Sequence, residues 1–380
     1  MGRQGHFVQN ERGYKSFKPS NLQDVEIKLK IDNETNKLAQ NINENLIKIN
    51  MKSDLVKNSD LFLYAYVYEE AVESSKIEGT ECTMEDIFEN INKTENNNIF
   101  NIADIKETIS NIRAIEYGVK KIKEMPLSTR FYKEIHKTLL SNVRGERKSP
   151  GELRTSQNWI GGKSIEDASF VPPNVEDMNE ALNELDKYIN DESDNINKII
   201  KCALIHYQFE TIHPFLDGNG RLGRIIILLY LIKEELLNKP YVYMSYFLKI
   251  NQIEYYDKLT KVREEDKYEE YIKFFLHCFN EAVDSVLRRM DTLNELHNKN
   301  ISKLPINNRK KKSYEIIFNY IENNPIFIIK EVVEQTNLSF NTVNSVLKKF
   351  EELDIIKKQN LYMRNKVYLY EEYINVFKRV

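Results

Sequence analysis

The feature that most constrains the fold is the run of residues 59–76, which contains neither glycine nor proline. Its apolar side chains recur mostly at helical spacing, and Gly79 stands where a helix would end with a C-terminal cap. Only 12 glycines and 9 prolines occur among the 380 residues, and 30% of the residues are charged. This composition is typical of a helix-rich globular protein and excludes a collagenous or disordered chain.

More helices are expected wherever the same period returns. These segments are residues 102–123, 128–140, 175–190, 196–210 and 222–237. At the N-terminus the pattern is weaker: residues 14–19 look irregular, and a helix is expected to begin near Ile27. Between residues 145 and 173 the period breaks, and β-prone residues flank Gly161-Gly162, which predicts a β-hairpin. The predicted core is therefore mainly α with one hairpin.

The C-terminal part differs in kind from the rest. A chain of 380 residues exceeds what one hydrophobic core usually organises, so two or three domains are expected. Past Leu293 the sequence becomes polar, which places a boundary near residue 300. Three helical segments and two short apolar segments follow, an order that predicts a winged helix-turn-helix domain over residues 301–380. These segments are residues 313–322, 330–336, 341–353, 355–356 and 366–369.

A winged helix can bind DNA or protein. The tail carries 14 Lys and Arg against 9 Asp and Glu, whereas the whole chain has a formal net charge of −3. If the partner is DNA, the contacts are expected within residues 341–366, from the second helix of the motif and from the wing. The candidate residues are Asn341, Thr342, Asn344, Lys348 and Lys366.

The cysteines and the apolar segments indicate in which cellular compartment the protein is expected. Cys82, Cys202 and Cys278 are far apart and odd in number, so we expect neither a disulfide framework nor a metal site built from them. The N-terminus shows no secretory signal, and the longest apolar run, residues 225–232, is far shorter than the roughly 20 residues of a membrane span. We expect a cytoplasmic protein without a membrane segment.

One short segment concentrates groups that bind phosphate. It runs His213-Pro214-Phe215-Leu216-Asp217-Gly218-Asn219-Gly220-Arg221-Leu222-Gly223-Arg224. The two glycines around Asn219 let successive N–H groups point into one concavity, and the helix expected behind them adds its positive end. Arg221 and Arg224 lie three residues apart, on one helical face, and can hold phosphate oxygens. The segment predicts a polyphosphate site.

The same segment contains a base and a hard metal ligand. His213, with an ordinary pKa of about 6.5, is largely neutral at cytoplasmic pH and can accept a proton from a hydroxyl. Asp217 offers the carboxylate oxygen that phosphate-bound Mg²⁺ requires. A lone histidine before proline is more often structural, and a lone Gly-Asn-Gly is usually a turn. It is the combination that points to chemistry.

This combination resembles the HPFx[DE]GNGRxxR signature of the Fic family, whose members mostly transfer AMP from ATP to Ser, Thr or Tyr of proteins. The resemblance implies that His213 is the catalytic base and Asp217 the Mg²⁺ ligand. It also implies that Arg224 meets the γ-phosphate and that Phe215 anchors the loop. The implied phosphate cradle consists of Gly218, Asn219, Gly220 and Arg221. Family members that phosphorylate carry Lys at the second glycine, so Gly220 favours nucleotidyl transfer.

The resemblance extends beyond this signature. Residues 130–140 look like an early core helix of the family, and residues 151–161, here called the flap, look like the hairpin that clamps target backbone by strand addition. The implied docking residues are Asn158, Trp159, Ile160 and Gly161. Tyr255, Tyr256 and Leu259 resemble the helix beside the adenine, although tyrosines this abundant could equally be core. His136 and His206 are expected to be core residues.

Residues 74–79, here called the inhibitory segment, match the [ST]xxxE[GN] pattern of Fic proteins through Ser74, Glu78 and Gly79. Their position before the core is similar to that of the subclass inhibited by its own chain. There the Glu pairs with the second arginine of the signature, here Arg224, and blocks the γ-phosphate. The segment could also be an ordinary end of a surface helix.

Together these features predict a Fic-type helical bundle with a β-hairpin flap and a winged helix-turn-helix domain. The expected domains are residues 1–100 with an inhibitory helix over about 59–79, residues 101–300 as the catalytic core, and residues 301–380. The predicted function is transfer of AMP from Mg·ATP to hydroxyls of a target protein and of the chain itself. The alternatives are a nucleotide-sensing DNA-binding regulator and an enzyme that also removes AMP. The donor nucleotide, the target and a homo-oligomeric state stay open.

Overall fold

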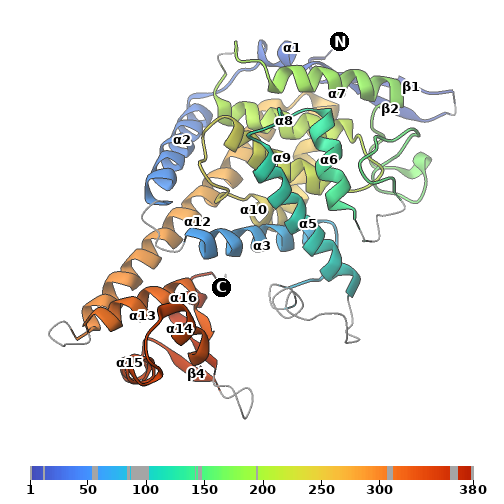
Figure 1. Cartoon of the computed structure of the whole chain (residues 1–380). Helices are drawn as coiled ribbons and strands as arrows, with labels where there is room; N and C mark the ends of the chain where they lie inside the picture. The colour runs from blue at the N-terminus through green and yellow to red at the C-terminus, as the bar shows by residue number, and fades with distance from the viewer. Residues whose placement is uncertain are drawn as a thin grey trace. The chain divides into compact units, whose positions relative to one another are not determined.

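The computed structural model is mostly helical, with two small β-sheets (Figure 1). It describes residues 2–11, 13–53, 59–83, 86, 102–141, 143, 148–193, 196–305, 311–359 and 367–377. Lys366, a candidate DNA contact, lies outside these ranges.

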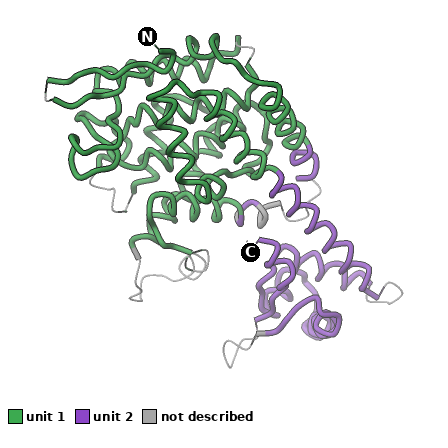
Figure 2. Tube along the Cα trace, turned by 180° about the vertical axis from the view of Figure 1, so that it is seen from behind, with its two compact units in different colours: residues 1–47, 66–283 green, residues 48–65, 284–380 purple. Residues whose placement is uncertain are grey.

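The chain divides into two compact units, which Figure 2 shows in different colours. One comprises residues 1–47 and 66–283, and the other residues 48–65 and 284–380. The divisions fall inside the helices α2 (Asn33–Ser53), α3 (Ser59–Ile77) and α12 (Tyr268–Lys303). The domain boundaries expected near residues 100 and 300 stay predictions.

Two consecutive helices form the centre of the first unit, α8 (Lys198–Ile212) and α9 (Asn219–Lys233). Every residue of α8 after the first is buried, as expected for a helix that is apolar nearly all round. Helices packed around this pair complete the bundle. They are α5 (Ile102–Lys121), α6 (Thr129–Leu139) and α7 (Val175–Ile189). The helices predicted from periodicity over these five segments are confirmed.

The first 32 residues differ from the prediction. Residues 14–19 are not irregular: β2 (Lys15–Pro19) pairs with β1 (Gly5–Gln9) in an antiparallel hairpin, and Phe17 is fully buried. The short α1 (Leu22–Glu26) follows, and Ile27 is 83% exposed. The long helix begins only at α2, where the Asp32 carboxylate accepts a hydrogen bond from the Thr35 N–H (2.7 Å). The apolar residues near Ile27 therefore lie in the segment between α1 and α2, and the prediction that a long helix begins there was wrong.

The predicted hairpin around Gly161-Gly162 is present as an antiparallel bridge between Ile160 and Phe170. Their N–H groups donate to each other's carbonyls at 2.8 and 3.1 Å. A side chain at Gly162 would place Cβ 2.2 Å from the Asp167 carbonyl oxygen, and φ there is 70°, so only glycine fits. The short 3₁₀ turn η2 (Ile165–Asp167) closes the loop.

Two further helices complete the first unit before the long helix α12. They are α10 (Ser245–Ile250) and α11 (Gln252–Glu265). They lie beside the end of α3, where their side chains reach the site described below.

In the second unit, the chain after α12 forms α13 (Lys311–Asn323), β3 (Ile326–Ile328), α14 (Ile329–Thr336), α15 (Phe340–Glu352), β4 (Lys357–Gln359), β5 (Val367–Leu369) and α16 (Glu371–Asn375). The three strands form an antiparallel sheet in the order β3-β5-β4. Apolar residues of α13 and α15, among them Phe318 and Phe350, pack edge to face in the core. The three helices α13, α14 and α15 lie where the sequence predicts them, whereas β3 and α16 were not predicted, and the winged helix-turn-helix assignment stays a prediction.

Membrane spans and disulfides were both expected to be lacking. Across the part of the chain that the structure describes, no helix has the length and apolar character needed to cross a bilayer. Cys82, Cys202 and Cys278 are all buried and free.

The burial of α8 predicts a stability effect. Leu204→Ala removes a fully buried side chain at the centre of the bundle and should lower the free energy of unfolding by about 2–5 kcal/mol. Ile253→Ala on α11, where the side chain is 90% exposed, is the matched control and should change it by less than about 0.5 kcal/mol. Urea unfolding followed by circular dichroism measures both, and similar losses would contradict this core.

Candidate active site

The phosphate-binding segment forms the loop between α8 and α9. His213 is the left-handed residue that ends α8, with φ 49° and ψ 61°, and its N–H donates to the Phe209 carbonyl (3.0 Å). Gly218, with φ 75°, precedes α9 in the same left-handed region, which a glycine adopts without strain. The two turns bring the start of α9 back beside the end of α8.

Asn219 closes this loop from within. Its side-chain oxygen accepts from the Phe215 N–H (2.9 Å), and its side-chain nitrogen donates to the Phe215 carbonyl (2.8 Å). The Asn219 side chain is buried by these contacts. The Asn219 side chain thus shapes the loop, and the cradle role that the resemblance implies for this residue stays a prediction.

His136 supports the loop from α6 and is a core residue, as predicted. Its Nδ1 accepts from the Gly151 N–H (2.9 Å), so its Nε2 carries the proton that it donates to the Asp217 carbonyl (2.9 Å). The ring stacks on Phe215 at 3.9 Å between centroids. Burial lowers the pKa of His136 to about 4, which keeps this donor pattern fixed at neutral pH. Phe215 is fully buried and anchors the loop.

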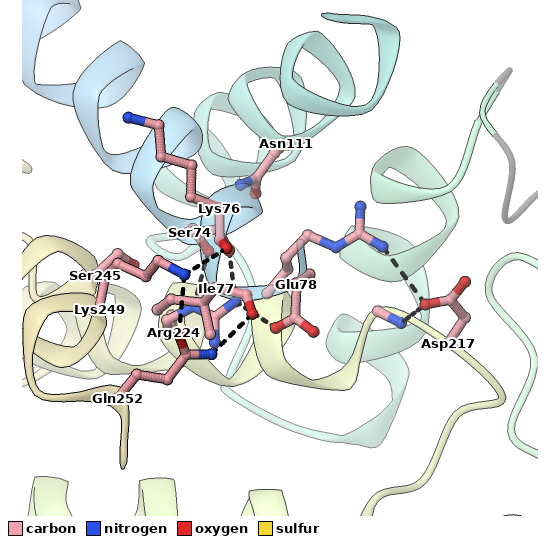
Figure 3. Close-up of polar contacts among 12 residues, drawn as sticks. Ser74, Lys76, Ile77, Glu78, Asn111, Asp217, Arg224, Ser245, Lys249 and Gln252 are labelled. Carbon is pink, nitrogen blue, oxygen red and sulfur yellow. Dashed lines mark hydrogen bonds and ion pairs between the residues drawn. The ribbon is translucent and has the colours of Figure 1, made fainter. Parts of the chain in front are cut away.

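Arg224 is buried in the second turn of α9 and is held by the inhibitory segment (Figure 3). Its Nε donates to the Ser74 hydroxyl (2.8 Å), and its Nη2 donates to the Ser74 carbonyl (2.9 Å) and to Oε1 of Glu78 (2.7 Å). The ion pair that the resemblance implies, between Glu78 and Arg224, is thus present in this chain.

The Glu78 carboxylate lies over the first turn of α9. A Cβ added at Gly220 would be 2.4 Å from Glu78 Oε1 and 3.1 Å from Arg224 Nη1. Burial acts to raise the pKa of Glu78, but the charge and hydrogen bond of Arg224 outweigh it, and the pKa falls below its ordinary value. An ionised carboxylate therefore occupies the helix N-terminus, where an anion is favoured.

The end of α3 is also fastened by side chains from α10 and α11 (Figure 3). Lys249 Nζ donates to the Lys76 carbonyl (3.0 Å), and Gln252 Nε2 donates to the Ile77 carbonyl (3.1 Å). These contacts satisfy carbonyls that a helix end leaves open. The sequence did not predict either residue, because every residue has a backbone carbonyl and a contact to one leaves no recognisable pair of side chains in the sequence.

His213 presents a neutral imidazole. Loss of solvation lowers its pKa to about 4, against the opposing charge of Glu78, and Arg263 and Arg154 lower it further. Within the described residues its buried Nδ1 has no hydrogen-bond partner. A neutral imidazole has a lone pair that can accept a proton.

Asp217 is the site's accessible carboxylate. Its side chain is 44% exposed, and Oδ1 accepts from the Gly218 N–H (2.6 Å). Arg221, by contrast, is buried and ion-paired with Glu107 (2.6 Å), with Asp217 at 3.6 Å. The Arg221 guanidinium thus braces the loop through two carboxylates.

The residues expected beside the adenine differ in how far they are exposed to solvent. Tyr255 and Leu259 are buried, and the Tyr255 hydroxyl is 2.8 Å from Nε2 of His206, whose ring stacks on it. Tyr256 is 46% exposed and accepts from Gln252 (3.4 Å). For Tyr255 these contacts favour the core interpretation. An adenine contact for any of the three stays a prediction.

The residues of the flap likewise differ in exposure and in the direction of their side chains. Trp159 is 43% exposed, and Ile160 and Gly161 lie at the bridge and its turn. Asn158 instead points inward, and its Nδ2 donates to the Phe215 carbonyl (3.1 Å). Arg154, which sequence reasoning did not single out, is fully buried and donates to the His213 carbonyl (3.0 Å).

Comparison with known proteins agrees with this geometry. Residues 126–231 match the Fic/DOC family, and residues 36–120 match the Fic/DOC family N-terminal region. The chain belongs to the Fic/DOC family. The matches cover the loop, the flap and the inhibitory segment.

Curated relatives are named protein adenylyltransferase Fic. The one from Drosophila ananassae is 25% identical over 167 residues, which is 44% of this chain and 30% of that protein. The one from Aedes aegypti is 30% identical over 155 residues, 40% of this chain and 28% of that protein. The similarity thus spans less than a third of the length of these Fic relatives.

Solved Fic structures share the fold. A Fic family protein from Desulfovibrio desulfuricans superposes with a TM-score of 0.61 over 90% of this chain and 97% of that one, at 16% identity. A Fic domain containing signaling protein from Bacteroides thetaiotaomicron gives 0.55 over 66% and 97%, at 19% identity. The predicted mainly α Fic fold is confirmed.

The burial of His213 predicts its titration. The Cε1–H signal of His213, assigned by its loss in His213→Gln, should stay constant from pH 8 to about 5.5 and titrate near pH 4 in NMR spectra. Because its pKa is lower in the folded than in the unfolded state, where it is about 6.5, the unfolded state binds more protons between these values. The His213 contribution to stability is therefore lost as the pH falls through this window. A midpoint near 6.5 would contradict the buried ring.

Proposed function

We propose that this chain transfers AMP from Mg·ATP to a hydroxyl side chain of a protein, with His213 as base. The observation that carries the proposal is the neutral imidazole of His213 beside a helix start whose anion site holds the Glu78 carboxylate. The names of the Fic relatives support the same reaction class.

The start of α9 suits a nucleotide polyphosphate. The Glu78 carboxylate lies against Gly220 in the first turn and accepts a hydrogen bond from the buried Arg224, so an anion is already held at this helix start. A phosphate carries more charge and more acceptor oxygens than a carboxylate, so it can replace Glu78 on the guanidinium. The γ-phosphate is the group we assign to Arg224.

Magnesium fits at Asp217. Its exposed carboxylate lies beside the same helix start. Among the residues that the structure describes, no three His, Cys, Asp or Glu side chains gather to hold a metal on their own. This donor set suits Mg²⁺ that brings phosphate and water ligands with it, and the bound ion would neutralise charge on the phosphates.

In the reaction, the hydroxyl oxygen of the target attacks the α-phosphorus. The bond from the α-phosphorus to the bridging oxygen of the β-phosphate breaks, and pyrophosphate leaves. His213 takes the hydroxyl proton on a ring nitrogen. The negative phosphates raise the pKa of His213, as Glu78 does here, and so strengthen the base when the nucleotide is bound.

Glu78 is then an inhibitor within the chain. Its carboxylate holds Arg224 and fills the space over Gly220, so the γ-phosphate and Glu78 exclude one another. Glu78 and a γ-phosphate would also repel each other as like charges at neighbouring positions on Arg224. We therefore propose that the chain is slow until the inhibitory segment moves.

Replacing Glu78 tests the inhibition. Glu78→Ala should raise incorporation of label from α-phosphate-labelled ATP by roughly 10- to 100-fold, since it removes a partly exposed charged hydrogen bond of Arg224. Glu73→Ala is the matched control, because Glu73 lies on the same helix but pairs with Lys76 (2.8 Å), and it should leave the rate unchanged.

The double variant Glu78→Ala/His213→Ala should return incorporation to background while retaining nucleotide binding. Mass spectrometry of the labelled chain identifies the group transferred. A Glu78→Ala protein that is folded but no faster than the parent would overturn the inhibition. Full activity without His213 would overturn its role as base.

A second function, DNA binding, is supported by the polar face of α15. Val343, Val346 and Leu347 are buried on one side of this helix. The other side presents Asn341, Asn344 and Lys348, which line a shallow hollow together with Tyr314. Amide and ammonium groups at this spacing can contact base edges and phosphates. We propose that this face binds double-stranded DNA.

Anisotropy of a fluorescent mixed-sequence duplex tests DNA binding. Lys348→Ala should weaken binding and lower the salt dependence by about one released ion, because it removes one phosphate contact. Lys330→Ala on α14, where the side chain is 77% exposed, is the control and should have little effect. Equal effects of the two variants, or no binding at low salt, would contradict a site on α15.

A further inference from the structure

The flap holds the backbone of the catalytic loop at three consecutive carbonyls. Arg154 Nε donates to the His213 carbonyl (3.0 Å), and the Arg154 N–H donates to the Pro214 carbonyl (3.0 Å). Asn158 Nδ2 donates to the Phe215 carbonyl (3.1 Å). One short segment of the flap thus binds three consecutive carbonyls of the loop that carries the base.

Arg154 is an unusual choice for this position. It is 1% exposed, and its remaining donors bind the carbonyls of Ser156 (3.2 Å) and Pro173. No carboxylate of the described residues forms an ion pair with it. Burial lowers the pKa of Arg154 to about 10, so it stays charged at neutral pH. Burying a cation against carbonyls alone is unfavourable, and a neutral donor could satisfy them.

The backbone at His213 explains what the contact controls. A left-handed conformation is uncommon for a residue other than glycine, and it needs support from its surroundings. The direction of the His213 carbonyl depends on ψ of the same residue that carries the imidazole. Fixing this carbonyl from the flap therefore fixes the direction of the His213 Cα–Cβ bond, from which the imidazole extends.

We propose that Arg154 and Asn158 are positioning residues that tie the base His213 to the flap, so that a hydroxyl held at the flap meets the imidazole at a fixed geometry. This inference rests on the proposed AMP transfer. It also changes the role expected for Asn158. Its side chain binds the Phe215 carbonyl of the catalytic loop, whereas the resemblance implied that it contacts the target protein. It also gives the flap a part in catalysis besides binding the target.

The Arg154 charge has a second consequence. The groups that act on the titration of His213 come from several elements: Glu78 after α3, Arg263 on α11, and Arg154 on the flap. Glu210, on α8 itself, is also buried near these charges. The Arg154 cation disfavours the imidazolium form of His213. Its removal should therefore raise the pKa of His213 and move the acid limb of the activity profile to higher pH.

The experiment uses the full chain carrying Glu78→Ala as the parent. Arg154→Lys keeps the charge but cannot donate along the same directions, and Arg154→Gln removes the charge. Both should lower kcat roughly 10- to 100-fold with the Kd for ATP within about twofold of the parent. Only Arg154→Gln should shift the acid limb upward. Arg130→Lys, an 83% exposed arginine on α6, is the matched control and should behave as the parent.

Asn158→Ala is a second variant, chosen because it removes no buried charge and so tests the tie even if the Arg154 variants do not fold. Asn219 still binds the Phe215 carbonyl, so the expected loss in kcat is smaller, about 3- to 10-fold. Unchanged kcat in folded variants, or a loss explained wholly by weaker ATP binding, would overturn the positioning role. A parent that transfers no AMP would instead overturn the proposed function.

Discussion

The buried guanidinium of Arg224 is the group on which the site depends. A cation at this depth needs an anion beside it, because an unpaired buried charge is strongly destabilising. In this structure the anion is Glu78, with Ser74 supplying two further acceptors. The need for a counter-ion is thus the link between the inhibitory segment and the catalytic loop, which are far apart in the sequence. Any ligand that displaces Glu78 has to bring negative charge of its own.

Around Arg224, three segments of the site are held by hydrogen bonds to backbone atoms. The loop between α8 and α9 is closed by Asn219 within and by His136 from below, so its backbone has few free polar groups. The flap is attached to this loop by backbone carbonyls, and the end of α3 by Lys249 and Gln252. Polar contacts to backbone atoms, more than apolar packing, set the geometry where chemistry is expected.

Much of this could be predicted from the sequence, and the rest could not for a definite reason. Long apolar segments without proline indicated α8 and α9, because a helix that is buried on all sides needs apolar residues along its whole length. The pairing of Glu78 with Arg224 was available only from the resemblance, since nothing local relates residues 146 positions apart. Arg154, Lys249 and Gln252 were missed because they bind main-chain carbonyls, which every residue offers. The strands β1 and β2 were missed because each has only five residues, many of them polar. The alternation of apolar and polar side chains over so short a segment is too weak to predict a strand.

The burial of α8 has a consequence for hydrogen exchange. The residues from Ile199 to Ile212 are all buried, so we expect their amides to exchange with solvent among the slowest of this unit. Glu78 follows the last turn of α3, where helix ends fray at a small fraction of that free energy. Arg224 lies on α9, whose residues 221–232 are also buried, so we expect the two partners of this ion pair to lie in segments that differ in local stability. The inhibitory segment can therefore open while the catalytic loop keeps its native conformation, provided that another anion replaces Glu78 beside Arg224.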